Sequence, residues 1–199
     1  MPRRLPALVC LIALYTAVLA FAPRPLVVAQ NRAGIPTRIS VSSDGTQGNE
    51  FSADPVLSGD GRYVVFISLA SNLVAGDTNG VKDAFVHDRQ TGLTSRVSVN
   101  SSGAQSNGEA AFLAMSADGR YVAFESSGSD LVAGDTNGFK DVFVYDRQTG
   151  LNSRVSVSSD GAQGNFDSRY PNLSADGRFI VFFSLSSTLV AGDTNGFTD

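Results

Sequence analysis

The sequence has no tryptophan, one histidine and one cysteine among 199 residues, and this scarcity limits the chemistry that it can support. Cys10 lies in an apolar N-terminal run, so an exported mature chain would hold no disulfide. Without a second histidine or a second cysteine, zinc centres and Ser-His or Cys-His catalysis are effectively excluded. The counterpart of His87 one repeat later is Tyr145, and a position that accepts tyrosine is not catalytic. The sequence therefore predicts a protein that is not an enzyme.

Long apolar runs are absent except at the N-terminus. A basic start at 1–4, an apolar run at 5–22 and Val-Val-Ala at 27–29 follow the order of a secretory signal peptide. We expect residues 1–29 to be this signal, cleaved after Ala29, with cleavage after Ala22 as the second choice. An uncleaved anchor is the alternative, because the run just reaches the length that crosses a bilayer. After cleavage we expect no membrane span and a secreted, periplasmic or cell-surface protein.

Positive charge is scarce once this segment is removed. Residues 1–29 hold three arginines and no acidic residue, which leaves 12 basic residues against 19 acidic ones and a net charge of −7. Because nucleic-acid affinity comes from neutralising phosphates, we expect no nucleic-acid partner. An acidic surface favours cations instead.

One octapeptide, Leu-Val-Ala-Gly-Asp-Thr-Asn-Gly, stands unchanged at 73–80, 131–138 and 189–196. The interval between its copies is the same both times, and we call this interval one repeat length. The repetition identifies the chain as a repeat array. Apolar residues alternate with period two and no window shows a helical stripe, so we expect an all-β fold. For the central unit the expected strands, named A to D, are 110–116, 120–126, 140–146 and 152–158.

Asp-Gly at 118–119 and Gln-Thr-Gly at 148–150 provide hairpin turns between these strands. Four antiparallel strands per repeat are typical of a β-propeller blade. The predicted ring is incomplete, so we expect further blades of the same chain. Its predicted parts are a linker (30–36) and propeller repeats (37–199) made of a leading strand D (37–50), blade 1 (51–108), blade 2 (109–166) and a truncated blade 3 (167–199).

Ser-Ala-Asp-Gly-Arg-Tyr-Val-Ala-Phe at 116–124, followed by Asp-Val-Phe-Val-Tyr-Asp at 141–146 and a glycine turn, resembles the TolB-type, WD-repeat-like propeller blade of bacterial exported proteins. The chain has Ala or Gly where this family usually has Pro in the turn, and it lacks a tryptophan in the preceding strand. The resemblance covers about residues 37–199 and implies the propeller fold. It does not imply one activity, because the family includes docking modules, accessory domains of enzymes and uncharacterised surface proteins.

Oxygen-bearing side chains gather in the B–C loops, which should emerge on the same face of the ring as the connections between blades. Asp-x-Asn-Gly-x-x-Asp offers three ligands around a glycine, as a calcium loop does, and calcium is the candidate cofactor. Turn formation is the alternative, because Asn-Gly and Asp are also favoured turn residues. The candidate ligands are Asp77, Asn79, Asp83, Asp135, Asn137, Asp141, Asp193, Asn195 and Asp199.

The pattern also predicts how these loops and the arginines are arranged. Leu131 and Val132 should lie under the loop, with Asp135 and Asn137 at its polar tip. Arginines on strand D and at the start of strand B should form surface pairs with Asp88 and Asp146, each contributing at most about 1 kcal/mol. The arginines concerned are Arg62, Arg96, Arg120, Arg154 and Arg178.

Three functions are compatible with these residues. The first is an exported, non-enzymatic binding or scaffold module that docks a protein or a glycan on its Asp-rich face. The second is a propeller gate or accessory domain of a larger hydrolase, whose catalytic domain would lie outside this chain. The third is a structural surface or adhesion protein that calcium makes rigid.

Overall fold

The computed structural model describes residues 27–30 and 34–199, and the regular structure of these residues is entirely β. The strands of the described residues are β1 (Val28–Gln30), β2 (Pro36–Arg38), β3 (Ser52–Leu57), β4 (Tyr63–Ser68), β5 (Asp83–Asp88), β6 (Thr94–Arg96), β7 (Ala110–Met115), β8 (Tyr121–Ser126), β9 (Asp141–Asp146), β10 (Leu151–Arg154), β11 (Ser168–Leu173) and β12 (Ile180–Ser184). They form two four-stranded sheets, β3–β6 and β7–β10, and two two-stranded sheets, β1–β2 and β11–β12.

Each four-stranded sheet is an antiparallel meander in which strands pair in chain order. β4 pairs with β5 from Tyr63 opposite Asp88 to Ser68 opposite Asp83, and β8 pairs with β9 in the same register one repeat later. We call β3–β6 blade 1 and β7–β10 blade 2. This topology confirms the prediction of an all-β, incomplete propeller built from four-stranded blades.

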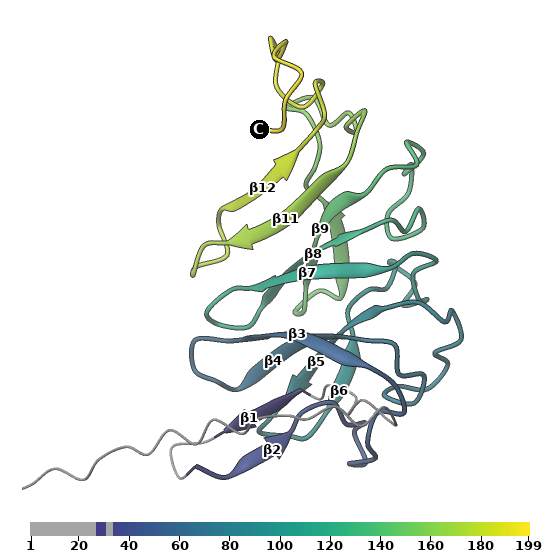
Figure 1. Cartoon of the computed structure of the whole chain (residues 1–199), viewed down its shortest axis with the longest axis vertical. Helices are drawn as coiled ribbons and strands as arrows, with labels where there is room; N and C mark the ends of the chain where they lie inside the picture. The colour runs from purple at the N-terminus through teal and green to yellow at the C-terminus, as the bar shows by residue number, and fades with distance from the viewer. Residues whose placement is uncertain (1–26, 31–33) are drawn as a thin grey trace, which may run out of the picture.

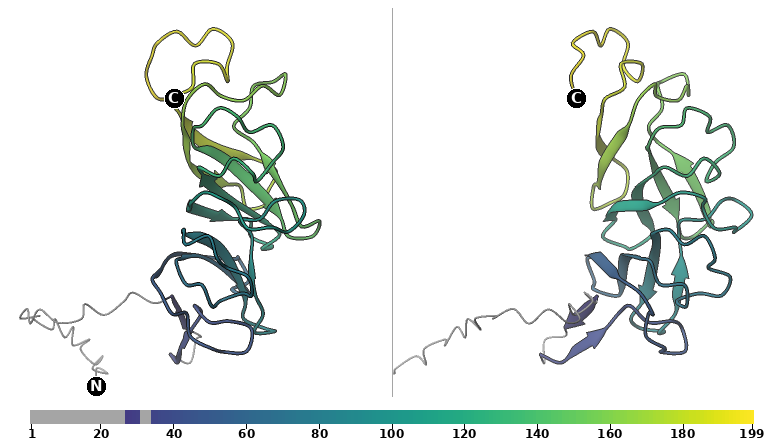
Figure 2. Two further views of the ribbon diagram at one scale, coloured as in Figure 1. Left: turned by 90° about the vertical axis from the view of Figure 1, so that its right-hand side faces the viewer. Right: turned by 45° about the vertical axis from the view of Figure 1, so that its right-hand side comes forward.

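The sheets are stacked in chain order, with β1–β2 at one end and β11–β12 at the other (Figure 1). Two further views show the C-terminal loop projecting beyond β12, far from β1–β2 (Figure 2). Because each blade is covered on both faces, its central strands are apolar on both sides, and all six residues of β5 are buried. Phe66 stacks on Phe85 with 5.8 Å between ring centroids, and an equivalent pair in blade 2 lies 5.9 Å apart.

Neighbouring blades meet at the Asp-Gly hairpins. The Gly59 N–H donates to the Ala117 carbonyl at 2.8 Å, and the Ala117 N–H donates to the Ala175 carbonyl at 2.8 Å. Tyr63 of blade 1 covers Gly119 of blade 2, and a Cβ added to this glycine would lie 2.4 Å from a ring carbon. The hairpin glycine is therefore required both for its positive φ of 71° and for the close approach of a neighbouring ring.

The first strand of every repeat (β3, β7 and β11) contains a β-bulge that the sequence pattern did not reveal. Asp54, Phe112 and Tyr170 have φ values of 53°, 49° and 55°, and the strand register shifts at each of them. None of them is a glycine, so the bulge places three L-residues in the left-handed region. They stand one repeat length apart, which shows that the bulge is part of the repeat.

Two predicted boundaries differ from the structure. Strand D of blade 2 ends at Arg154 rather than at residue 158, because residues 155–163 turn back: the Ser158 N–H donates to the Ala162 carbonyl and Val157 bridges to Gln163. Within the predicted leading segment (37–50), the regular strand is only β2, which ends at Arg38 and pairs with β1. β1 falls within the predicted signal peptide and linker, and Val27 beside it is buried in the core under blade 1. The remainder of the predicted signal lies outside the described residues.

Candidate functional site

Two octapeptide loops connect the second and third strands of a blade, β4 to β5 and β8 to β9, and the third copy follows β12. We call residues 73–80, 131–138 and 189–196 loops 1, 2 and 3. Leu73 and Leu131 are each about 1% exposed and hold loops 1 and 2 against the sheets. The prediction that Leu131 lies under its loop is confirmed. The two glycines of every loop have positive φ values, which allow the chain to reverse direction around the polar residues.

The acidic residues of loop 1 turn inward and share one arginine. Arg96 Nη1 lies 3.3 Å from Asp77 Oδ1 and 3.1 Å from Asp83 Oδ2. The arginine side chain is 8% exposed, Asp77 6% and Asp83 0%, so two carboxylates and one guanidinium form a buried cluster. Arg96 was predicted to pair on the surface with Asp88, and this was wrong: β6 places it next to the start of β5 instead.

Loop 2 repeats this cluster. Arg154 Nη1 lies 3.1 Å from Asp135 Oδ1 and 3.4 Å from Asp141 Oδ2. Asp135 was predicted at the polar tip of its loop, and this was wrong, because its side chain is buried. In the described part of the chain, Arg154 of the fourth strand is the only basic residue that forms an ion pair with Asp135. The carboxylate therefore points inward, toward this arginine.

Each asparagine of loops 1 and 2 closes its own turn. The Asn79 amide donates to Asp83 Oδ2 at 2.9 Å and to the Ser106 carbonyl at 2.9 Å, while its oxygen accepts the Val81 N–H at 3.3 Å. Asn137 makes the equivalent bonds to Asp141, Gly164 and Phe139. The asparagine thereby ties the loop to the connection that leads into the next sheet.

A glutamine and a serine complete the cluster, and neither was predicted from the sequence. Gln105 Oε1 accepts from the Thr78 N–H and from Arg96 Nη1, each at 3.0 Å, and Ser98 Oγ donates to the Asp83 carboxylate. Gln163 and Ser156 do the same in the next repeat. Their recurrence one repeat length later was the signal in the sequence that could have identified them.

Burial changes the titration of the loop carboxylates. The pKa of Asp77 is raised above its ordinary value by loss of hydration and then by repulsion from Asp83, and Arg96 opposes this rise. The pKa of Asp135 is raised for the same reasons, with Asp141 and Arg154 in these roles. Two carboxylates with one arginine leave each cluster with a net negative charge.

Loop 3 has the same acids without the arginine. Asp193, Asn195 and Asp199 keep their spacing, and the Asn195 amide donates to the Asp199 carboxylate at 3.2 Å. In the described part of the chain no arginine or lysine forms an ion pair with Asp193 or Asp199. A cavity of about 370 Å³ is lined by these residues and by Ser186.

The calcium prediction stays a prediction, and the geometry gives it a sharp test. In loops 1 and 2 the guanidinium already lies between the two carboxylates that would coordinate the ion, so arginine and calcium are alternatives there. If calcium binds these loops, a chelator lowers the melting temperature of the protein, and replacing Asp135 with Ala removes the chelator's effect. Identical melting curves of the wild-type protein with and without chelator would contradict calcium binding.

The opposite end of each blade carries the predicted surface pairs. Arg62 Nη2 lies 2.7 Å from Asp88 Oδ2, and Arg120 Nη2 lies 2.8 Å from Asp146 Oδ2, with both arginines 38% exposed. These two pairs are confirmed. The Arg120 guanidinium lowers the pKa of Asp146 to about 2, and Arg62 holds the pKa of Asp88 below its usual range.

This shift predicts a pH dependence of stability. Since the folded pKa of Asp146 lies below the ordinary value of 3.8, its ion pair stabilises the protein above pH 3.8, and this stabilisation is lost as pH falls to about 2. Between pH 3.8 and about 2, the free energy of unfolding should therefore fall less for Asp146→Asn than for the wild type. Urea unfolding at several pH values measures this, and parallel pH profiles for the two proteins would refute the prediction.

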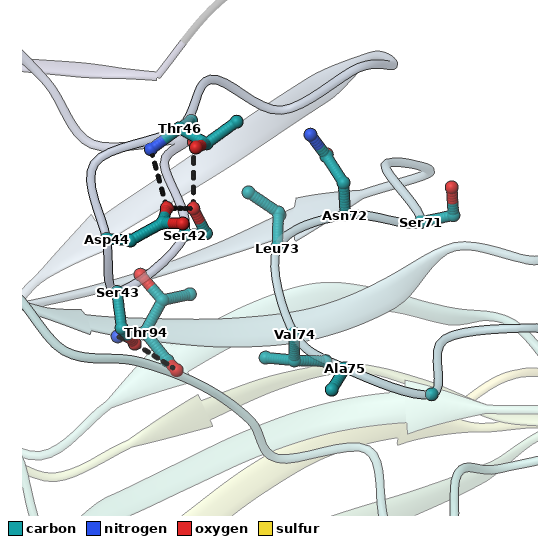
Figure 3. A pocket seen from close by; sticks show the side chains of 11 residues that line it. Ser42, Ser43, Asp44, Thr46, Ser71, Asn72, Leu73, Val74, Ala75 and Thr94 are labelled. Atoms are coloured by element: carbon teal, nitrogen blue, oxygen red, sulfur yellow. Dashed lines mark hydrogen bonds between the residues drawn. The ribbon is translucent and has the colours of Figure 1, made fainter.

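A cavity of about 640 Å³ opens on the octapeptide face beside loop 1. One wall is the connection from β2 to β3, where Asp44 accepts from the Ser42 hydroxyl and the Thr46 N–H (Figure 3). The facing wall is the chain from Ser71 to Gly76 (Figure 3). Serine, threonine, asparagine and aspartate side chains therefore surround the opening, with the aliphatic side chains of loop 1 on one side.

The side chain of His87 does not line this cavity itself, but it contacts Thr94, which does. Its side chain is buried, and Nδ1 lies 2.9 Å from Thr94 Oγ1. Burial lowers its pKa, so the imidazole is held in the neutral form.

No family model and no curated protein match the chain. Among solved structures, it is similar to TolB from Acinetobacter baumannii (15% identity over 80% of this chain and 43% of that one, TM-score 0.42). It is also similar to the propeller domain of the Trilobed protease from Pyrococcus furiosus, with 12% identity over 68% of this chain and 35% of that one and a TM-score of 0.44. A prolyl endopeptidase is similar too, with 16% identity over 79% of this chain and 22% of that one and a TM-score of 0.49. The chain spans less than half the length of each, and these likenesses concern the fold alone. In residues 27–30 and 34–199, no helix is long and apolar enough to cross a membrane.

Proposed function

We propose that this protein is an exported, non-enzymatic propeller module that binds a protein or glycan partner on its octapeptide face. The cavity beside loop 1 carries this proposal, because it combines a volume of about 640 Å³ with hydroxyl groups on both walls, a carboxylate on one wall and an amide on the other. Pockets of this size accommodate small ligands or one segment of a larger partner.

The walls of this cavity are held in place by bonds that reach across the sequence. The Thr94 N–H donates to Ser43 Oγ at 3.0 Å, the Asn72 amide donates to the Gln47 carbonyl at 2.8 Å, and the Asn49 N–H donates to Asn72 Oδ1 at 2.9 Å. A site whose walls are fixed before the partner arrives loses less conformational entropy on binding. The octapeptide contributes by presenting a short, exposed Ala75-Gly76 tip beside the cavity.

Filling the cavity should remove binding without unfolding the protein. Ala75→Arg places a long side chain at its rim, and we expect partner affinity to fall at least tenfold, or about 1.4 kcal/mol. Binding is measured on a glycan array and against cell-envelope proteins of the organism that produces the protein. Melting curves verify that the variant is folded. Gln148→Arg is the matched control, because Gln148 is exposed on the hairpin at the other end of blade 2. An equal loss of partner affinity in both variants, or no loss of affinity in either, would contradict the proposed binding surface.

A further inference from the structure

The residues that line the cavity beside loop 1 favour one kind of ligand. Among these described residues there is one carboxylate, that of Asp44, and there is no basic and no aromatic side chain. Neutral sugars are commonly held by stacking their C–H faces on aromatic rings, which provide large apolar surfaces. A cavity lined by hydroxyl groups, an amide and one carboxylate therefore suits a cationic group better than a neutral sugar.

Asp44 is charged, exposed and without a counter-charge. Its Oδ1 accepts from the Ser42 hydroxyl and from the Thr46 N–H, and these bonds lower the pKa of the carboxyl to about 2. In the part of the chain that the structure describes, no basic residue forms an ion pair with Asp44. At neutral pH the wall of the cavity therefore carries a full negative charge.

The turn that holds Asp44 can form without an acidic residue. One repeat later the corresponding turn has Asn100 in place of Ser42 and Ser102 in place of Asp44. There Asn100 Oδ1 accepts from the Ser102 N–H and from the Ala104 N–H, each at 3.0 Å. Both turns are closed by the same backbone bond, with N···O distances of 2.8 and 2.9 Å. Folding of this turn therefore does not require a carboxylate at position 44.

The facing wall offers apolar surface to the aliphatic part of a long side chain. Val74 and Ala75 of loop 1 line this wall, across the cavity from Asp44 (Figure 3). Lysine and arginine side chains lie along apolar surface with their methylene groups and keep the charged group in polar surroundings. A carboxylate on one wall and methyl groups on the other match both parts of such a side chain.

The rest of the octapeptide face has the same sign of charge. Its segments 39–51, 69–82, 97–109, 127–140 and 155–167 contain two lysines, Lys82 and Lys140, against Asp44, Glu50, Asp77, Glu109, Asp130, Asp135, Asp160 and Asp167. Arg96 and Arg154 reach this face from the fourth strands, but each is shared by two carboxylates. An acidic face attracts a basic partner over long distances and repels an acidic one.

We propose that the partner is a protein that inserts a lysine or arginine side chain into this cavity, with its charged group on Asp44 and its methylene groups on Val74 and Ala75. This inference rests on the binding function proposed above and specifies the chemistry of its ligand. The inserted side chain supplies the counter-charge that Asp44 lacks within the described chain.

Short peptides test the chemistry of the ligand. The probes are capped pentapeptides of glycine and serine with lysine, arginine, acetyl-lysine or glutamate at the centre, and cellotetraose serves as the neutral glycan. Nuclear magnetic resonance titration of the purified protein gives the dissociation constants. The lysine and arginine peptides should bind, and the acetyl-lysine peptide should bind about fivefold more weakly, as expected for loss of one exposed ion pair. Equal affinity for the lysine and acetyl-lysine peptides, or tighter binding of cellotetraose or of the glutamate peptide, overturns the proposal.

A double variant removes the charge of Asp44 and keeps its turn. Ser42→Asn together with Asp44→Ser copies the side chains that close the turn at 100–104, so the protein should still fold, and melting curves verify this. Affinity for the lysine peptide should fall about fivefold, to that of the acetyl-lysine peptide for the wild type. Unchanged affinity of the folded double variant overturns the proposal.

Asp130→Asn is the matched control for this loss of charge. It removes one carboxylate from the same face, but Asp130 does not line the cavity. Its Oδ1 accepts the Asn107 N–H at 3.0 Å, and its counterpart Asn72 accepts the Asn49 N–H in the same way at 2.9 Å, so asparagine preserves the bond. Affinity for the lysine peptide should stay at the wild-type value. A loss equal to that of the double variant would show that only the total charge of the face matters, and this would overturn the proposal.

Ala75→Arg distinguishes failure of this inference from failure of the proposed function. It should remove binding of every ligand that enters the cavity, whereas the double variant at positions 42 and 44 should weaken only basic ligands. If a neutral probe binds, is lost in Ala75→Arg and is retained in the double variant, the binding function stands and the basic ligand is overturned. If the lysine peptide binds Ala75→Arg as tightly as the wild type, both the cavity and its basic ligand are overturned.

Discussion

Replacing Arg154 with methionine is expected to lower the free energy of unfolding by about 3–5 kcal/mol. Arg154 is 10% exposed and is shared by Asp135 and Asp141, whose side chains are 4% and 0% exposed. Methionine fills much of the same volume but leaves two buried carboxylates with no positive charge beside them. Urea unfolding monitored by circular dichroism at neutral pH measures the loss.

The chain offers a matched control for this change. Arg120→Met also removes an arginine from an aspartate, but the Arg120 side chain is 38% exposed, so the loss should be at most about 1 kcal/mol. The deficit of Arg154→Met should also shrink as pH falls, because the pKa of Asp135 is already raised and protonation removes its buried charge. Equal losses in the two variants would show that burial of the loop 2 cluster has no energetic consequence.

Replacing Gly119 with alanine is expected to lower the free energy of unfolding by about 2–5 kcal/mol, the sum of a backbone cost and an overpacking cost. The positive φ of 71° costs a side chain about 1–2 kcal/mol, and overpacking adds about 1–3 kcal/mol. The overlap is severe because the new Cβ would lie 2.4 Å from a carbon of Tyr63, and the Arg147 guanidinium, 3.8 Å from the centre of that ring, limits its movement. Urea unfolding of the variant and the wild type measures the difference.

Gly138→Ala separates these two contributions. Its φ of 74° is nearly the same, but no atom lies within 4 Å of an added Cβ, so only the backbone cost of about 1–2 kcal/mol should appear. The difference between the two variants measures the contact between blades. If Gly138→Ala were as damaging as Gly119→Ala, the packing of Tyr63 against blade 2 would contribute nothing.

The site was predicted in part. The sequence located the octapeptide loops and placed them on the same face as the connections between blades, and bonds such as Gln105 to Thr78 join these segments. The direction of the acidic side chains was not predictable, because Asp77 reaches Arg96 only through the path of its loop. The carboxylates of loops 1 and 2 therefore belong to salt bridges that spacing alone did not reveal.

Local pattern determined the repeat, the strands and the hairpins, since period-two alternation and Asp-Gly turns act over a few residues. Only the tertiary structure decided which charges meet, because Asp77 and Arg96 lie on different segments and approach each other only when the sheet has formed. It also decided that Val27 and β1 belong to the fold, although the same residues follow the pattern of a signal peptide. A short apolar segment has no fixed role until a core covers it, and that core is built from distant parts of the chain.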